Sequence, residues 1–261
     1  MAKVLAITNQ KGGVGKTTTT VNLAASLAAA KKRVLLIDLD PQGNATMGSA
    51  INKSRLTVTI YDVLIGAKNV REARVFSEAG KYDVLPANRD LAGAEIELVD
   101  IENRETRLKE ALELVSEDYD FILIDCPPAL NLLTLNGLCA AKSVMIPMQC
   151  EYYALEGLSD LVNTIKKVRA HLNSDLQIEG LLRTMYDPRN SLAQQVSEQL
   201  LQHFGDKVYR TVIPRNIRLA EAPSFGLPAL YHDKESRGTQ AYLALAGELM
   251  NNAEVAVAVA I

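Results

Sequence analysis

A glycine-rich stretch that follows an apolar run near the start of the chain has the residue types of a phosphate-binding loop. Glycines let the backbone turn tightly, so that successive N–H groups point at one anion, and a helix beginning at the end of the turn adds the positive end of its dipole. The stretch reads Lys11-Gly12-Gly13-Val14-Gly15-Lys16-Thr17-Thr18, and the apolar run before it reads Val4-Leu5-Ala6-Ile7. This order of run, loop and helical pattern predicts a nucleotide-binding site.

Two lysines in this loop have different expected tasks. Lys16 is expected to reach the β and γ phosphates of a nucleotide, and the hydroxyl of the next residue, Thr17, to bind Mg²⁺. The general pattern has a glycine six residues before that lysine, but this chain has Gln10 there, and a second lysine, Lys11, opens the loop. A lysine in that position points away from the phosphates of its own loop. We therefore expect Lys11 to act on a nucleotide held by a second subunit.

Two carboxylates follow a second apolar run, at residues 34–37. Phosphoryl transfer needs little covalent help, so a carboxylate that positions water and cations that stabilise phosphate charge are sufficient. Asp40 is the candidate for orienting the attacking water, and Asp38 is expected near Mg²⁺, through a water molecule. A simpler reading is that both acids cap the next turn, because Asp often precedes Pro-x-Gly, as it does at 40–43. Their position behind a phosphate loop favours the chemical reading.

Another apolar run, at residues 121–124, is also followed by an acid, Asp125. A buried strand ending in an aspartate is the arrangement that holds Mg²⁺ beside the threonine of a phosphate loop. Asp125 is therefore predicted to be a ligand in the outer shell of the metal. The next residue, Cys126, is expected to be a small buried hydrophobic residue rather than a reactive thiol.

The elements that must position these groups follow from the spacing of apolar residues. Apolar, β-branched runs separated by segments with helical spacing predict a mostly parallel sheet. Right-handed crossovers then place helices on both faces of the sheet, and ligands bind beyond the carboxyl ends of the strands. The runs lie at 4–7, 34–37, 82–85, 121–124, 143–147, 178–182 and 211–213, and the segments expected at the ligand edge are 8–18, 38–44, 125–131 and 214–221.

Among the helical segments, residues 154–169 show the clearest amphipathic pattern. Apolar residues recur at intervals of three and four, which places one face on the sheet. We predict a single α/β domain over residues 1–250, with helices on both faces of a twisted sheet. The segment 251–261 is a short Ala/Val run and is expected to be a flexible, frayed tail.

Composition limits the partners and the compartment. The formal net charge is −3 and the pI is about 5.7, so DNA binding would have to depend on a local patch. Such a patch is expected between residues 183 and 218, which hold six basic residues and three acids. The three cysteines form no Cys-x-x-Cys pair, and no segment reaches the roughly 18 consecutive apolar residues of a membrane span. The expectation is a cytoplasmic protein without a membrane anchor, a disulfide framework or a zinc site.

The loop Lys-Gly-Gly-Val-Gly-Lys-Thr-Thr at 11–18 resembles the deviant Walker A loop of the ParA/MinD family of dimerising P-loop ATPases. Together with Asp-Pro-Gln-Gly-Asn-Ala-Thr at 40–46, Gln-Cys-Glu-Tyr-Tyr-Ala-Leu-Glu-Gly-Leu at 149–158 and Ile-Pro-Arg-Asn at 213–216, it makes the chain similar to Soj-type chromosomal ParA proteins from about residue 2 to about residue 250. The resemblance implies a Mg²⁺-dependent ATPase that forms a homodimer around two ATP molecules. It further implies that the dimer binds double-stranded DNA of the nucleoid without sequence preference. A ParB-type centromere-binding partner would stimulate hydrolysis during chromosome or plasmid segregation.

The same resemblance assigns four further residues. Pro214 and Asn216 fall where adenine is contacted, and Arg189 and Arg218 fall where DNA is bound. From the residues alone, an isolated surface arginine is usually explained by solubility. Arg189 follows a loop signal and Arg218 starts a predicted helix, so both could be exposed on one face of a dimer.

Three other functions use the same kind of loop. A MinD-type positioning ATPase anchors to membrane through a basic amphipathic C-terminal helix, which is disfavoured because no lysine or arginine follows Arg237. A nucleotide-driven iron–sulfur reductase needs exposed cysteines that bridge two subunits, whereas Cys139 and Cys150 flank an apolar strand and are expected to be buried. An ATP-using ligase of small metabolites would need a substrate pocket that no motif in the sequence indicates.

Overall fold

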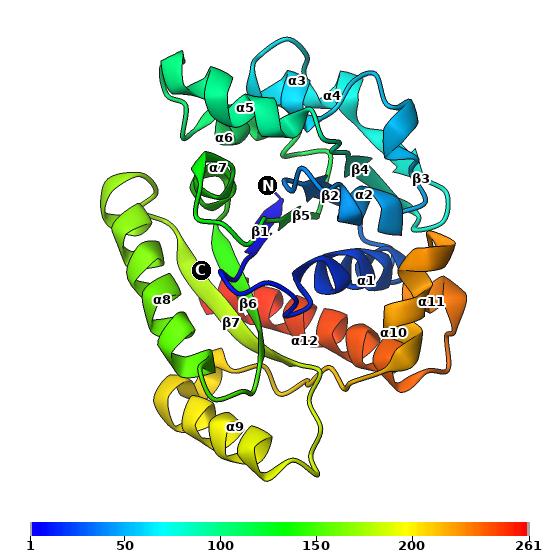
Figure 1. The fold of residues 1–261 in the computed structure, drawn as a ribbon, viewed down its shortest axis with the longest axis vertical. Coiled ribbons are helices and arrows are strands. Elements are labelled where there is room, and N and C mark those ends of the chain that lie inside the picture. Colours follow the sequence, from blue (N-terminus) through cyan, green and yellow to red (C-terminus); the bar gives the residue numbers. More distant parts are fainter. Residues whose placement is uncertain (1, 260–261) are drawn as a thin grey trace.

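In the computed structural model, which describes the backbone of residues 2–259 and the side chains of residues 2–252, seven strands form one sheet (Figure 1). The strand order is β3-β4-β2-β5-β1-β6-β7, and neighbours are parallel except for the antiparallel pair β3/β4. The strands are β1 Lys3–Ile7, β2 Val34–Asp38, β3 Val75–Ser77, β4 Tyr82–Leu85, β5 Phe121–Asp125, β6 Ser143–Gln149 and β7 Gln177–Thr184. The predicted fold class, a mostly parallel α/β sheet, is therefore confirmed.

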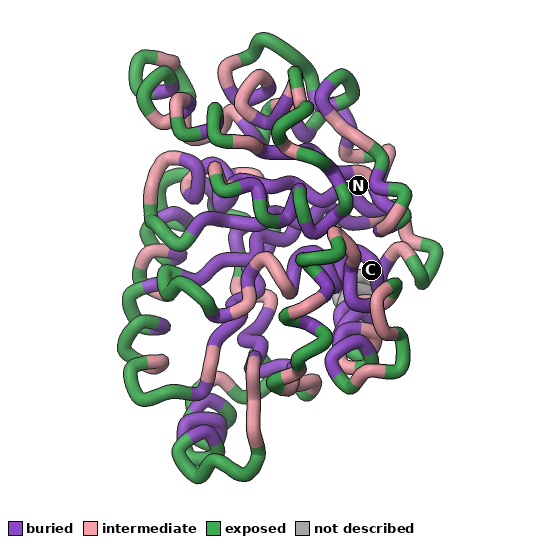
Figure 2. Tube along the Cα trace, turned by 45° about the vertical axis from the view of Figure 1, so that its right-hand side comes forward, coloured by how far each residue is buried: buried purple, intermediate pink, exposed green. Residues whose placement is uncertain are grey.

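Helices cover both faces of this sheet, and the tube in Figure 2 shows the strands as the buried centre of the molecule. One face carries α1 and α12, while α7 and α8 lie on the other (Figure 1). Alternate strand residues enter the two cores: Leu5 and Ile7 face α1, whereas Val4 and Ala6 face the opposite side. Strands buried on both faces consist of continuous apolar residues, which explains the uninterrupted runs in the sequence.

The helices connect the strands in the order that the sequence pattern predicts. The α-helices are α1 Lys16–Ala29, α2 Asn44–Gly48, α3 Ile60–Leu64, α4 Val70–Ala73, α5 Leu91–Glu97, α6 Arg107–Glu113, α7 Leu132–Ala140, α8 Ala154–His171, α9 Ser191–Phe204, α10 Ile217–Glu221, α11 Ala229–His232 and α12 Arg237–Val259. Short 3₁₀ turns lie at Lys53–Arg55, Leu98–Asp100, Gly205–Lys207 and Ala222–Phe225. The amphipathic helix expected at 154–169 is α8, whose apolar face, Leu158, Leu161, Ile165 and Val168, is buried.

Strand register brings the predicted acidic residues to one edge. Ile7 at the end of β1 and Asp38 at the end of β2 both pair with Asp125 at the end of β5. The loops after these three strands therefore leave the sheet side by side, at its carboxyl edge.

One expectation about the strands needs correction. Residues 211–213 do not form a strand. Ile213 exchanges backbone hydrogen bonds with Arg183 at the end of β7 and with Tyr186 just after it, and Tyr186 and Pro214 form only an isolated bridge. The short antiparallel edge strand β3 was not expected. The backbone of residues 251–259, within the segment 251–261 that was expected to be a flexible tail, forms the end of helix α12, and residues 260–261 lie outside the described part. None of the helices among the described residues combines the length and apolar character needed to cross a bilayer.

Candidate nucleotide site

The phosphate loop joins β1 to α1 and has the backbone conformation that only glycine adopts easily. Gly13 has φ 74° and Gly15, the residue that precedes α1, has φ 88°. A Cβ atom added at Gly12 or Gly13 would meet no atom within 4 Å, so this side of the loop is open. The first turn of α1 contains no acidic residue. A loop that is open on one side and leads into a helix N-terminus suits an anion.

The two lysines of the loop lie in different environments. Lys16 is buried, and its ammonium donates a hydrogen bond to the Lys11 carbonyl oxygen at 3.1 Å. Burial lowers the pKa of Lys16, and the carboxylates of Asp125 and Asp40 act in the opposite direction. The side chain of Lys11 instead extends outward and pairs with Glu151 at 2.5 Å, with about half of each side chain exposed (47% and 50%). Lys16 thus faces the inside of the loop, and Lys11 is available at the surface.

Asp125 at the end of β5 holds two hydroxyls of α1. The Thr17 hydroxyl donates to Oδ2 at 2.7 Å and the Thr20 hydroxyl to Oδ1 at 3.1 Å. Burial raises the pKa of Asp125, the nearby charge of Asp38 raises it further, and the two hydroxyls lower it. No group of three or more His, Cys, Asp or Glu side chains that could hold a metal occurs among the described residues. Mg²⁺ commonly takes few protein ligands besides phosphate oxygens and water, so one hydroxyl with a carboxylate behind it fits this ion.

The two acids after β2 differ in what they contact. Asp38 is fully buried; its Oδ2 accepts hydrogen bonds from the Thr46 N–H and hydroxyl, and its Oδ1 accepts one from the Asp40 N–H. These bonds favour a structural role for Asp38 in holding the start of α2, which is the simpler reading of the sequence. Asp40 is half-buried and accepts one hydrogen bond, from the Gln42 N–H at 2.9 Å. Its carboxylate therefore remains available at the rim of the loop.

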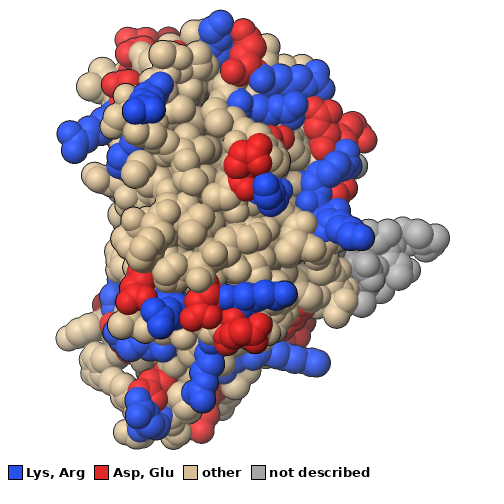
Figure 3. Space-filling model, turned by 90° about the vertical axis from the view of Figure 1, so that its right-hand side faces the viewer, with Lys and Arg blue, Asp and Glu red and all other residues tan. Residues whose placement is uncertain are grey.

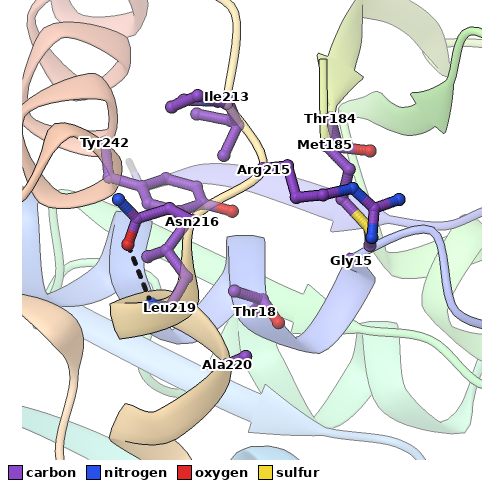
Figure 4. A pocket seen from close by; sticks show the side chains of 11 residues that line it. Gly15, Thr18, Thr184, Met185, Ile213, Arg215, Asn216, Leu219, Ala220 and Tyr242 are labelled. Carbon is purple, nitrogen blue, oxygen red and sulfur yellow. Dashed lines mark hydrogen bonds between the residues drawn. The ribbon is translucent and has the colours of Figure 1, made fainter. Parts of the chain in front are cut away.

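A cavity of about 160 Å³ opens beside the loop, between β7, α10 and α12 (Figure 4). Pro214 and Asn216, predicted to contact adenine, both line it, together with the apolar residues Ile213, Leu219 and Ala220. The Asn216 side-chain oxygen caps α10 by accepting hydrogen bonds from the Arg218 and Leu219 N–H groups, which fixes the position of Asn216 in the lining of the cavity. Sequence reasoning missed Thr184, Met185, Arg215 and Tyr242, which also line this cavity. Thr184 and Met185 could have been predicted, because they follow the apolar run 178–182 and therefore lie at the carboxyl edge of the sheet, where ligands bind.

The two arginines predicted to bind DNA are exposed, but each is paired with acids. Arg189, whose side chain is 89% exposed, pairs with Asp187 at 2.8 Å. Arg218, 49% exposed, pairs with Glu221 at 2.9 Å and with Asp233 at 3.3 Å. On the face shown in Figure 3, basic and acidic side chains are intermixed in an upper and a lower group, with a broad area of uncharged residues between them. The basic window 183–218 is also weaker than its composition suggests, because Arg183 is buried.

All three cysteines are buried and unpaired. Burial raises the pKa of each thiol, for Cys139 and Cys150 to about 11. Thiols that stay protonated and enclosed cannot ligate a cluster shared between two subunits. The expected burial of Cys126, Cys139 and Cys150 is confirmed.

Comparison with known proteins agrees with this geometry. A family described as an AAA domain matches residues 2–178. The sporulation initiation inhibitor protein Soj of Bacillus subtilis is 57% identical over 97% of this chain and 100% of its own length. The chromosome partitioning protein ParA of Myxococcus xanthus is 52% identical over 96% of this chain and 88% of its own length.

Among solved structures, a cobyrinic acid a,c-diamide synthase from Mycobacterium smegmatis, with bound ADP and magnesium, superposes with a TM-score of 0.86 at 38% identity. The match covers 97% of this chain and 96% of that protein. The fold, the phosphate loop and the sequence identity all indicate the same family. The chain belongs to the ParA/MinD family of P-loop ATPases, and its sequence places it with the Soj and ParA chromosome-partitioning proteins.

Proposed function

We propose that this ATPase partitions chromosomal or plasmid DNA by forming an ATP-bound homodimer that binds double-stranded DNA without sequence preference. A ParB-type partner would stimulate hydrolysis and so return the dimer to monomers. The similarity to Soj and ParA supports a partitioning role, and the geometry of the phosphate loop supports the dimer.

The observation that carries the proposal is the outward position of Lys11. Lys16 lies inside the loop and is placed to contact the phosphates bound there. Lys11 is therefore not needed for the phosphates of its own subunit. The Lys11 ammonium is held at the surface by an exposed ion pair with Glu151, and such pairs contribute at most about 1 kcal/mol. Release of Lys11 toward the phosphates of a second subunit would therefore cost little.

The remaining groups of the loop fit the same reaction. ATP supplies the phosphoryl group, and Mg²⁺ would neutralise its charge. Thr17, positioned by Asp125, would hold the metal, and Lys16 would exchange the Lys11 carbonyl for phosphate oxygens. Asp40 would orient the attacking water, because its carboxylate lies at the rim of the loop and has few hydrogen bonds. Pro214 and Asn216 would contact adenine in the cavity beside the loop.

Two rival functions are less well supported. An iron–sulfur reductase would need accessible thiolates, and the three cysteines are buried. The synthase similar in structure shares a fold and a nucleotide site with this chain, yet Soj and ParA are more similar in sequence. A shared fold does not by itself transfer an activity.

Sedimentation velocity with ATP, ADP or no nucleotide tests the proposal. The parent protein should dimerise with ATP alone. Lys11→Ala should stay monomeric and lose hydrolysis while binding ADP like the parent. Asp40→Ala should form a dimer that persists, because phosphate contacts survive while the transition state loses its orienting group.

The matched control is Lys68→Ala, which breaks another exposed ion pair, with Glu72, away from the loop. It should dimerise and hydrolyse ATP like the parent. Normal ATP-dependent dimerisation and hydrolysis by Lys11→Ala would refute the role of Lys11.

A further inference from the structure

Two neighbouring residues at the end of β7, Arg183 and Thr184, donate hydrogen bonds to segments that line the proposed nucleotide site or lead into it. The hydroxyl of Thr184 donates a hydrogen bond to the Val14 carbonyl oxygen in the phosphate loop, at 2.8 Å. Thr184 is buried, and its side chain would lie 3.9 Å from a Cβ added at Gly15. The turn into α1 thus lies directly against Thr184.

Arg183 lies on the opposite face of β7, because successive side chains of a strand alternate. It is only 8% exposed, and it makes no ion pair with an acidic residue in the described part of the chain. Its guanidinium donates instead to neutral oxygens: Nη2 to the carbonyls of Tyr209 at 2.9 Å and Arg210 at 3.3 Å, and Nη1 to the Ser197 hydroxyl at 2.8 Å. The buried Nε–H of Arg183 has no hydrogen-bond partner among the described residues. A buried cation is costly without compensation, so these bonds are needed to offset the charge, and two of them join residues 209–210 to β7.

The same strand end continues into the cavity that we assign to the base. The Arg183 carbonyl accepts a hydrogen bond from the Ile213 N–H, and the Ile213 carbonyl accepts one from the Tyr186 N–H. Between these bonds, Met185 has φ 49°, a left-handed conformation that is uncommon for a residue with a side chain. Such backbone strain persists where the surrounding structure enforces it. Met185 and Ile213 both line the cavity.

We propose that Thr184 and Arg183 are positioning residues that hold the phosphate loop and the base-binding segment 209–216 in register on one strand. The inference rests on the proposed nucleotide site. Thr184 acts on the phosphates through the Val14 carbonyl. Arg183 acts on the base through the carbonyls of Tyr209 and Arg210, which precede Pro214 and Asn216. Because the two side chains lie on opposite faces, their effects on the two parts of the ligand are separable.

Calorimetric titration with ADP and with pyrophosphate, both with Mg²⁺, tests this division and avoids dimerisation and hydrolysis. Thr184→Val removes the hydroxyl and keeps the shape; it should weaken both ligands about fivefold to tenfold, the value of one buried hydrogen bond. Arg183→Met should weaken ADP about tenfold and leave pyrophosphate unchanged.

Controls separate positioning from loss of the fold. Thr184→Ser keeps the donor and should restore the affinity for both ligands. Ser143 begins β6, at the end of the strand away from the proposed nucleotide site, and its buried hydroxyl has no hydrogen-bond partner among the described residues. Ser143→Ala should leave both affinities unchanged. If Arg183→Met does not fold, Arg183→Lys serves, since one ammonium cannot replace the planar donor fork and should again weaken ADP alone.

Equal weakening of ADP and pyrophosphate by the Arg183 variant would overturn the inference, as would unchanged affinities in Thr184→Val. A parent protein that binds neither ligand would instead refute the proposed nucleotide site.

Discussion

At the scale of single residues, the site distinguishes groups that look equivalent in the sequence. Thr17 and Thr20 lie one turn apart on α1, and both donate a hydrogen bond to Asp125. Thr20 is fully buried and also donates to the Lys16 carbonyl, whereas Thr17 is half-buried at the start of the helix. Only Thr17 can present its oxygen to a metal beside the phosphate loop. The same distinction separates the buried Lys16 from the exposed Lys11.

This difference predicts opposite behaviour for two isosteric changes. Thr17→Val should remove most of the dependence of ADP affinity on Mg²⁺, so that chelation of the metal hardly alters the dissociation constant. Thr20→Val should keep the Mg²⁺ dependence and lower the free energy of unfolding by about 1–3 kcal/mol, because a buried carboxylate loses one donor. ADP titrations with Mg²⁺ and with a chelator measure the first effect, and urea unfolding measures the second. A strong Mg²⁺ dependence retained in Thr17→Val would show that another group holds the metal.

At the scale of elements, the acids at the sheet edge depend on how closely α7 approaches the strands. Gly137 in the middle of α7 allows this approach: an added Cβ would lie 3.0 Å from the Cys126 sulfur and 3.2 Å from Leu39 Cδ1. Cys126 and Leu39 directly follow Asp125 and Asp38, and both are buried. Interiors are close-packed, so these neighbours have little room to move.

Gly137→Ala should therefore destabilise the protein although alanine is the better helix former. The gain in helix propensity is about 1 kcal/mol, and overpacking costs about 1–3 kcal/mol, so we expect a net loss of up to about 2 kcal/mol. Gly247→Ala in α12 is the matched control, since a Cβ there meets no atom within 4 Å. It should stabilise the protein by about 0.5–1 kcal/mol. Urea unfolding of both variants decides the sign, and a stabilised Gly137→Ala would contradict close packing at α7.

At the scale of the whole molecule, charge decides how DNA can be bound. The formal net charge is −3, and Arg189 and Arg218 are each engaged with acids. A monomer therefore offers two arginines that must exchange carboxylates for DNA phosphates. Exposed ion pairs are weak, so the exchange costs little, but two contacts give little affinity. Doubling the arginines in a dimer raises the salt dependence by about 0.9 for each phosphate neutralised.

We accordingly predict that DNA binding requires ATP and varies little among unrelated duplexes of equal length, because phosphate contacts carry no sequence information. Arg218→Glu should abolish DNA binding and leave ATP-dependent dimerisation intact, and Arg189→Glu should act in the same direction. Fluorescence anisotropy over a range of salt concentrations measures the affinity and its slope. Undiminished binding by both variants would place the DNA surface elsewhere.

Local signals in the sequence were sufficient for the fold and for the centre of the site. The glycines of the loop, the continuous apolar runs and the acids that end two of them depend on a few consecutive residues, so Lys16, Thr17 and Asp125 could be predicted to come together. The strand predicted at 211–213 was wrong because β-branched residues also occur in a segment that joins β7 through isolated backbone hydrogen bonds and not through a continuous ladder.

Tertiary structure alone decided the contacts between distant segments. Thr184 meets Val14 across 170 positions, and Lys11 meets Glu151 across 140. From the sequence, Arg183 was expected to belong to a basic patch between residues 183 and 218, but in the structure its side chain is buried. The physical reason is that periodicity and turn chemistry act between near neighbours, whereas burial, ion pairing and the direction of a side chain at a strand end depend on which elements pack together. The sequence by itself determined that a phosphate loop exists, and only the packing of β7 against it decided which residues hold it in place.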